Sequence, residues 1–370
     1  MTLLRTVAIA AVFLALFAWG LFSSPFANHP ENVPSSEREP AFRDNFYDVA
    51  MRGHFAWIVG YHGTILRSQD QGLTWELQPS GTTEALFRVS AVNANEAWIA
   101  GSYGTILHTR DGGKSWHKQQ TPTEEHLFGL DFINSRKGWA VGSRGTVLHT
   151  DDGGETWTNR AIDADIILND VRFLDARQGW AVGEFGRIYR TRDGGLSWTK
   201  QNSPIEVPFI SGASRNLFRL LMSDSRSGWA FGLDGVILTS QDGQNWEMAA
   251  QDGGSPADAK RYHLFSASSV GLKNWAVGER GTVLMSRIDS RRWDASGAKS
   301  SPSNLNGIAF SADDTGLIVG NRGIILRTDD AGKQWTPVRI ALKGLPRGQD
   351  RDVHRLLGSC AQRPFLYQNP

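Results

Sequence analysis

The chain has 370 residues and a formal net charge of +1, from 39 Lys and Arg against 38 Asp and Glu. This balance argues against a dedicated nucleic-acid-binding protein, which normally carries a basic excess. A single cysteine excludes an internal disulfide and a cysteine-rich metal site. Tryptophan (14 residues) and glycine (40 residues) are unusually frequent, and their positions indicate the fold.

Residues 1–27 have the pattern of an export or membrane-targeting segment. Arg5 precedes an uncharged run over residues 6–22, which is at the short limit for a membrane span. We expect an uncleaved transmembrane signal-anchor that tethers the chain through residues 6–22, with a cleaved signal peptide as the alternative. Both place the rest of the chain outside the cytoplasm, because Arg5 stays inside. Residues 28–41, rich in Pro, Ser, Asn and Glu, are expected to form a flexible spacer.

Seven copies of one repeat occupy residues 42–342. The pattern Trp-x-x-Gly recurs from Trp57 to Trp275 at intervals of 41 to 49 residues, and Leu317 takes the Trp place in the seventh copy. Each copy continues as Gly-x-x-Gly, an apolar run and then Ser/Thr-x-Asp-x-Gly-x-x-Trp. Four short β-prone runs per copy, separated by Gly and Asp clusters, predict four strands, here called a to d. A repeat of this length and strand number is typical of one propeller blade. The sequence therefore predicts an all-β fold, a seven-bladed β-propeller of four-stranded antiparallel blades.

The aspartate in the turn between strands c and d is expected to be structural. Its carboxylate can accept hydrogen bonds from N–H groups further along the turn, and the following Trp would cover the turn with apolar surface. One catalytic Asp in every blade would have no chemical rationale. The set consists of Asp70, Asp111, Asp152, Asp193, Asp242 and Asp330.

Two connections between repeats are longer than the others, residues 201–216 and 249–261. The turns that follow them are also degraded, since the fifth copy is one residue short and the sixth lacks its Gly. Long connections on a rigid scaffold are where function collects. The basic segment 343–370 is expected to be a tail that packs on the propeller or binds a partner, with Cys360 as an unpaired surface thiol.

The turns between strands b and c should share one face of the propeller with the connections between blades, because the strands alternate in direction. We call this face the b–c face. Arg and aromatic side chains dominate binding hot spots. We therefore predict partner binding by Arg144, Arg280, Arg322, Tyr103, Phe185 and His62, each one residue before the second Gly of its turn; Asp234 takes this place in the fifth copy. The alternative is that these exposed positions accept any polar residue and have no role.

The repeat resembles two related groups of proteins. The Ser/Thr-x-Asp-x-Gly-x-x-Trp element resembles the Asp box of sialidases, and the full unit, cleanest over residues 138–157, resembles the photosystem II stability/assembly factor propellers. The second resemblance implies a non-catalytic propeller on the non-cytoplasmic side of a membrane, where it helps to assemble or stabilise a membrane protein complex. The implied location is the inner membrane facing the periplasm, or the thylakoid lumen in a photosynthetic source. A cleaved signal peptide would instead give a secreted or soluble periplasmic protein.

Two other functions remain open from the residues alone, an Asp-box glycoside hydrolase of the sialidase type and a scaffold for a periplasmic transporter. A sialidase requires arginines for the substrate carboxylate, a Tyr nucleophile with a paired carboxylate and an acid/base Asp. We find no early Arg-Ile-Pro segment and no His-x-x-x-His pair. We therefore expect no enzyme activity, no metal or other cofactor and no nucleic-acid partner. The expected form is a monomeric propeller that binds a membrane protein complex.

Overall fold

The computed structural model describes residues 44–162, 165–207, 215–251, 262–288, 290, 292–296, 302–338 and 340. The predicted signal-anchor, the spacer and the basic tail with Cys360 lie outside these residues. Within the described ranges, no helix is long and apolar enough to cross a membrane.

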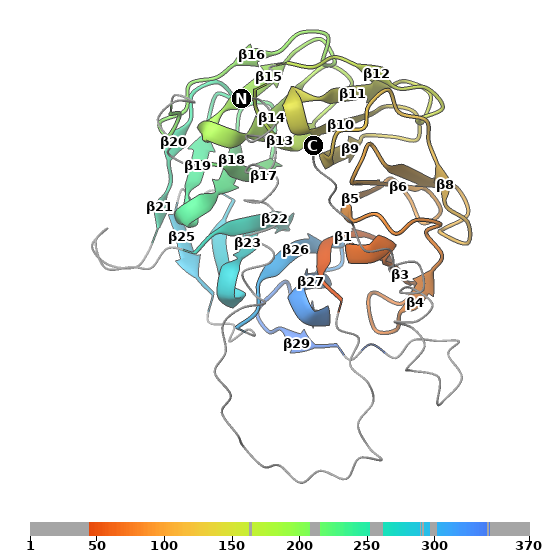
Figure 1. The fold of residues 1–370 in the computed structure, drawn as a ribbon. Coiled ribbons are helices and arrows are strands. Elements are labelled where there is room, and N and C mark those ends of the chain that lie inside the picture. The colour runs from red at the N-terminus through yellow and green to blue at the C-terminus, as the bar shows by residue number, and fades with distance from the viewer. Residues whose placement is uncertain are drawn as a thin grey trace, which may run out of the picture. The chain divides into compact units, whose positions relative to one another are not determined.

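Seven sheets follow one another around a central space, which the first strand of each sheet lines (Figure 1). Blades 1 to 3 are β1–β4 (Phe46–Arg52, Phe55–Gly60, Ile65–Ser68, Glu76–Gln78), β5–β8 (Leu86–Ala91, Ala97–Gly101, Ile106–Thr109, His117–Lys118) and β9–β12 (Leu127–Phe132, Gly138–Gly142, Val147–Thr150, Thr158–Asn159). Blades 4 and 5 are β13–β16 (Leu168–Phe173, Gly179–Gly183, Ile188–Thr191, Thr199–Lys200) and β17–β20 (Leu217–Met222, Gly228–Gly232, Ile237–Ser240, Glu247–Met248). Blades 6 and 7 are β22–β25 (Leu264–Val270, Lys273–Gly278, Val283–Arg287, Arg292–Ala295) and β26–β29 (Leu305–Phe310, Gly316–Gly320, Ile325–Thr328, Thr336–Pro337). Within each blade the four strands pair antiparallel in chain order, which confirms the predicted seven-bladed propeller.

Blade 6 differs from the prediction because it contains a fifth strand. Residues Ala250–Gln251 form β21, which pairs parallel with β25 at the outer edge of the sheet. This segment belongs to the connection that the sequence predicts as long and irregular. An edge strand offers unpaired N–H and C=O groups. The start of the connection pairs with this edge. Residues 252–261 of the connection lie outside the described part of the chain.

The second strand of each blade is buried on both sides. In β10, Trp139, Ala140 and Val141 are all fully buried. Neighbouring blades cover the two faces of the strand, which explains why apolar residues occupy consecutive rather than alternate positions. Each hydrophobic cluster accordingly joins residues of two adjacent blades; Trp139, for example, shares one with Phe173 of blade 4.

In blades 2, 3, 4 and 6 the Trp of strand b contacts the following blade. The indole Nε1 atoms of Trp98, Trp139 and Trp180 donate 3.0 Å hydrogen bonds to the carbonyl oxygens of Gly153, Gly194 and Gly243, respectively. These glycines lie in the c–d turn of the following blade. The ring also packs on that turn, since a Cβ atom at Gly332 would lie 2.5 Å from the Trp275 ring. The strand-b Trp is therefore an inter-blade contact as well as a core residue.

The Asp of the c–d turn organises its own turn. Asp152 accepts hydrogen bonds from Thr150 Oγ1 (2.8 Å), Thr156 N (2.9 Å) and Thr156 Oγ1 (2.6 Å). Desolvation raises the pKa of Asp152, but these hydrogen bonds outweigh it and lower the pKa from 3.8 to about 2. The same kind of contact from a Ser or Thr two residues earlier recurs at Asp70, Asp111, Asp193, Asp242 and Asp330.

The ring closes by contacts between blades 7 and 1 rather than by a shared sheet. Asn306 Nδ2 donates to Phe46 O (2.7 Å), and Gly323 N donates to Asp44 O (2.6 Å). Arg327 Nε donates to Gln71 O at 3.0 Å. Leu317, which replaces Trp in blade 7, packs on Gly72 in the c–d turn of blade 1.

The inter-blade indole bond predicts a difference between two otherwise equivalent substitutions. Trp139→Phe leaves the buried carbonyl of Gly194 without its indole donor. Trp275→Phe removes a ring of similar burial whose Nε1 has no hydrogen-bond partner among the described residues. We expect the first variant to lose about 1–3 kcal/mol more unfolding free energy than the second. Urea unfolding checks this, and equal losses would show that the indole bond contributes nothing.

The Asp turn predicts a pH-dependent stability. The folded-state pKa of Asp152 is lower than the unfolded one, so its carboxylate stabilises the fold above the unfolded value of 3.8, and this contribution is lost as pH falls toward about 2. Asp152→Asn should therefore lower the urea midpoint at neutral pH, and the gap to the unsubstituted protein should narrow between pH 4 and pH 2. Asp329→Asn, at a side chain that is 77% exposed, is the control and should change little at any pH. A gap at Asp152 that does not depend on pH would contradict the assignment.

Candidate functional site

Seven residues at the tips of the b–c turns share an unusual backbone conformation. We call them the turn-tip ring: His62, Tyr103, Arg144, Phe185, Asp234, Arg280 and Arg322. Their φ angles lie between 51° and 62°, in the left-handed region. Non-glycine residues rarely adopt this region, and each such residue costs of order 1–3 kcal/mol. Glycine would adopt this conformation without the strain, yet none of the seven positions is a glycine.

The following blade holds the main chain at four positions of the ring. The main-chain N–H of Tyr103 donates to His126 Nδ1 (3.3 Å), and that of Asp234 donates to His263 Nδ1 (3.0 Å). In two other blades an Asn side chain takes this role, with Asn304 accepting from Arg280 N and Asn45 from Arg322 N, both at 3.2 Å. The acceptors lie just before strand a of the following blade. In these four blades a contact with the following blade therefore holds the main chain of the turn.

The side chains of the ring differ in how available they are. Those of Arg144 and Arg280 are 66% and 64% exposed, and Tyr103 is 62% exposed. Arg144 Nε lies 3.5 Å from Glu125, and the Arg280 guanidinium lies over the Tyr262 ring at 5.6 Å.

Three further ring residues complete this comparison. Arg322 and His62 are exposed, and the His62 ring touches Tyr61 with 4.0 Å between centroids. Phe185 is only half-buried and packs against the hydrophobic cluster between blades 3 and 4. Phe185 therefore supports the core as well as the surface. The ring places one residue on each blade rather than bringing the six predicted binding residues into one cluster.

A second group of aromatic residues lies where strand a begins, and sequence reasoning missed it. The Tyr47 and Phe87 centroids are 5.9 Å apart, and those of Phe87 and Phe128 are 5.2 Å apart. Phe218 and Phe265 form a similar pair at 5.8 Å. We call these five residues the aromatic arc. The signal was available, because all five occupy the second position of strand a.

The aromatic arc lies at the same end of the propeller as the turn-tip ring. Strand a starts beside the b–c turn, as the pairing of Phe46 with Gly60 shows. Tyr47, Phe87 and Phe128 are half-buried and keep part of their rings accessible. Burial raises the pKa of the Tyr47 hydroxyl, followed by the charge of Asp44, so this group stays protonated. The b–c face therefore combines an aromatic centre with cationic and aromatic side chains further out.

Buried charges line the channel further in. Asp48, Asp131 and Asp170 each accept a main-chain N–H from strand a of the next blade, at 3.1, 2.7 and 2.9 Å. Arg88 lies 3.7 Å from Asp48 and 3.4 Å from Asp170. Arg172 Nη1 bonds Asp131 at 3.1 Å.

The protonation of these channel carboxyl groups is set by burial. Desolvation raises the pKa values of Asp48 and Asp131, although Arg88 and Arg172 oppose the shift. The carboxylates connect the inner strands of neighbouring blades, so they are tied to backbone rather than placed for chemistry on a substrate. Across the described residues there is no group of three or more His, Cys, Asp or Glu that could hold a metal ion.

A comparison with curated proteins gives no significant match. Among solved structures, YCF48 bound to a D1 peptide superimposes with a TM-score of 0.61 at 22% identity, covering 81% of this chain and 99% of that one. YCF48 from Cyanidioschyzon merolae gives a TM-score of 0.60 at 19% identity, with 78% and 97% covered.

Enzymes share the fold at lower identity. The GH74 xyloglucanase from Xanthomonas campestris gives a TM-score of 0.64 at 12% identity and covers 81% of this chain and 55% of that one. Such a likeness shows the fold alone. The family model for the photosynthesis system II assembly factor YCF48 matches residues 33–121, 115–167, 161–270 and 255–329, which span most of the chain. The chain belongs to the YCF48 family of photosystem II assembly factors.

Proposed function

We propose that the protein binds an exposed segment of a membrane protein through its b–c face, and thereby acts as a non-catalytic assembly or stability factor for a membrane complex. One observation carries the proposal, the seven non-glycine residues held at positive φ in the turn-tip ring. A strained conformation that recurs in every blade, with a large or charged side chain in each, is retained at a cost in stability. Binding of a partner through those side chains would explain why the strained backbone conformation is kept.

The chemistry of the b–c face suggests the kind of segment it binds. Arg144, Arg280 and Arg322 provide positive charge, and Arg pairs with carboxylates through two parallel hydrogen bonds. The half-buried rings of the aromatic arc suit an aromatic or aliphatic side chain. The partner segment should therefore combine acidic and apolar residues. The related YCF48 bound to a D1 peptide supports a membrane protein as the partner.

We infer the rest of the arrangement from the sequence. Residues 6–22 would tether the propeller to the membrane, and the propeller would work as a monomer on the periplasmic or lumenal side. The channel aspartates have roles in holding the blades together, which favours binding over catalysis. A photosynthetic source would make photosystem II the target complex.

Replacing the three ring arginines with glycine separates binding from stability. The variant Arg144→Gly, Arg280→Gly and Arg322→Gly loses the cationic side chains and relieves the left-handed strain at three turns. We expect affinity for a D1 peptide to fall at least about 10-fold, because buried hot-spot arginines each contribute more than 1 kcal/mol. The melting temperature should stay the same or rise. Fluorescence anisotropy and thermal unfolding measure the two effects.

Asp234→Gly is the matched control, because it relieves the same backbone strain in blade 5 without removing a cation. Binding should persist or strengthen in this variant, since a negative charge leaves the face. Cross-linked capture from membranes should recover the same membrane protein subunits as the unsubstituted protein. Undiminished peptide binding and capture by the triple variant would place the interaction elsewhere.

A further inference from the structure

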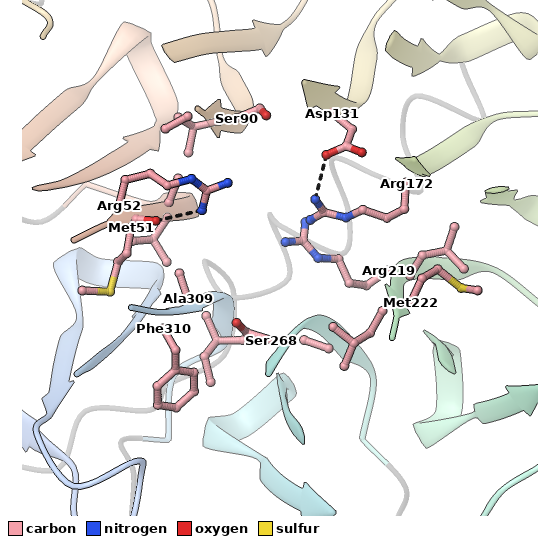
Figure 2. A pocket seen from close by; sticks show the side chains of 18 of the residues that line it. Met51, Arg52, Ser90, Asp131, Arg172, Arg219, Met222, Ser268, Ala309 and Phe310 are labelled. Atoms are coloured by element: carbon pink, nitrogen blue, oxygen red, sulfur yellow. Dashed lines mark hydrogen bonds and ion pairs between the residues drawn. The ribbon is translucent and has the colours of Figure 1, made fainter. Parts of the chain in front are cut away.

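We propose that the end of the central channel opposite the b–c face is a binding site for a small organic carboxylate. A cavity of about 320 Å³ opens there, lined by the later residues of strand a from several blades. Figure 2 shows Arg52 on one side of this cavity, with Arg172 and Arg219 facing it from the other. Cavities that hold small molecules begin at about this size.

Arg52 is available for a ligand. Its Nη1 atom donates to the carbonyl oxygen of the adjacent Met51 at 2.9 Å. This contact uses one of the five N–H donors of the guanidinium group. Burial and then the charge of Arg172 lower the pKa of Arg52. Asp131, which bonds Arg172 at 3.1 Å, offsets part of this effect. An anion between the two guanidinium groups would be attracted by both of them.

Arg219 is buried without enough partners. Its side chain is 6% exposed, and its Nε and Nη1 atoms have no hydrogen-bond acceptor among the described residues. The nearest carboxylate, Asp170, lies 3.9 Å away and also faces Arg88 at 3.4 Å and Arg172 at 3.9 Å. One carboxylate therefore serves three arginines. Unpaired buried charge is costly, so this site lacks negative charge.

The balance of the whole channel points the same way. Among the described residues in and around the channel, four arginines, Arg52, Arg88, Arg172 and Arg219, face three aspartates, Asp48, Asp131 and Asp170. The excess is positive, which favours an anionic ligand over a cation. A carboxylate is planar and matches the fork of a guanidinium group.

The remaining walls indicate the rest of the ligand. Leu221, Met222 and Phe310 line the cavity beside the charged groups. These side chains suit a short hydrocarbon or aromatic body attached to the carboxylate. We therefore assign the site to organic acids of small size, with the carboxylate placed between Arg52 and Arg172.

Calorimetric titration of the full chain with benzoate, succinate and inorganic phosphate tests this assignment. We expect saturable binding of at least one carboxylate at millimolar concentration, stronger than that of phosphate. Arg52→Gln should weaken it about 10- to 100-fold, the effect of losing a charged hydrogen bond. Because the Arg52 side chain hydrogen-bonds only the adjacent Met51 among the described residues, this variant should keep the fold, as unchanged thermal unfolding without ligand would show.

Arg219→Gln tests the buried side of the site and should also weaken binding, and Asp329→Asn, at a side chain that is 77% exposed, is the control that should leave carboxylate binding unchanged. If neither carboxylate binds, if phosphate binds more tightly, or if folded Arg52→Gln binds as well as the unsubstituted protein, the proposal is overturned. These outcomes are independent of partner capture by the b–c face, so either proposal can fail alone.

Discussion

The structure depends on a contact that recurs in blades 2, 3, 4 and 6, between the Trp of strand b and the c–d turn of the following blade. In blades 2 to 4 the indole nitrogen donates to a glycine carbonyl of that turn. The Asp of the c–d turn accepts hydrogen bonds that shape this turn, and the glycine leaves space for the indole ring. Trp and Gly, the two residue types that are unusually frequent in the sequence, therefore contact each other between these blades.

Much of the fold was predictable because the repeat encodes it. Strand order, blade number and the position of both turns follow from spacing alone, and the structure confirms them. The fifth strand of blade 6 was not predictable, since β21 occupies two ordinary residues whose pairing depends on an open sheet edge nearby. The residues near β21 in the sequence do not indicate that this edge lies beside them in the fold.

The site was predictable only in part. Alternation of strand direction correctly places the turn-tip ring on one face, but the half-burial of Phe185 depends on a neighbouring blade. The channel network was missed for a similar reason. Asp48, Asp131 and Asp170 look like isolated polar residues in apolar strands, and their partners come from other blades, about 40 or more residues away along the chain. A comparison of equivalent positions in all seven repeats would have pointed to both the aromatic arc and the channel carboxylates.

The way in which blades 7 and 1 meet bears on the duplication of blades and on circular permutation of the chain. Each blade is one continuous stretch of chain, and in the part of the chain that the structure describes no strand is exchanged across the seam. Side-chain and main-chain contacts between described residues, such as those of Asn306 and Gly323, join the two blades. Ring order and chain order are therefore the same, which suits growth by duplication of whole blades. It also makes the architecture permissive of circular permutation, since a break moved to another blade boundary would leave all seven sheets whole.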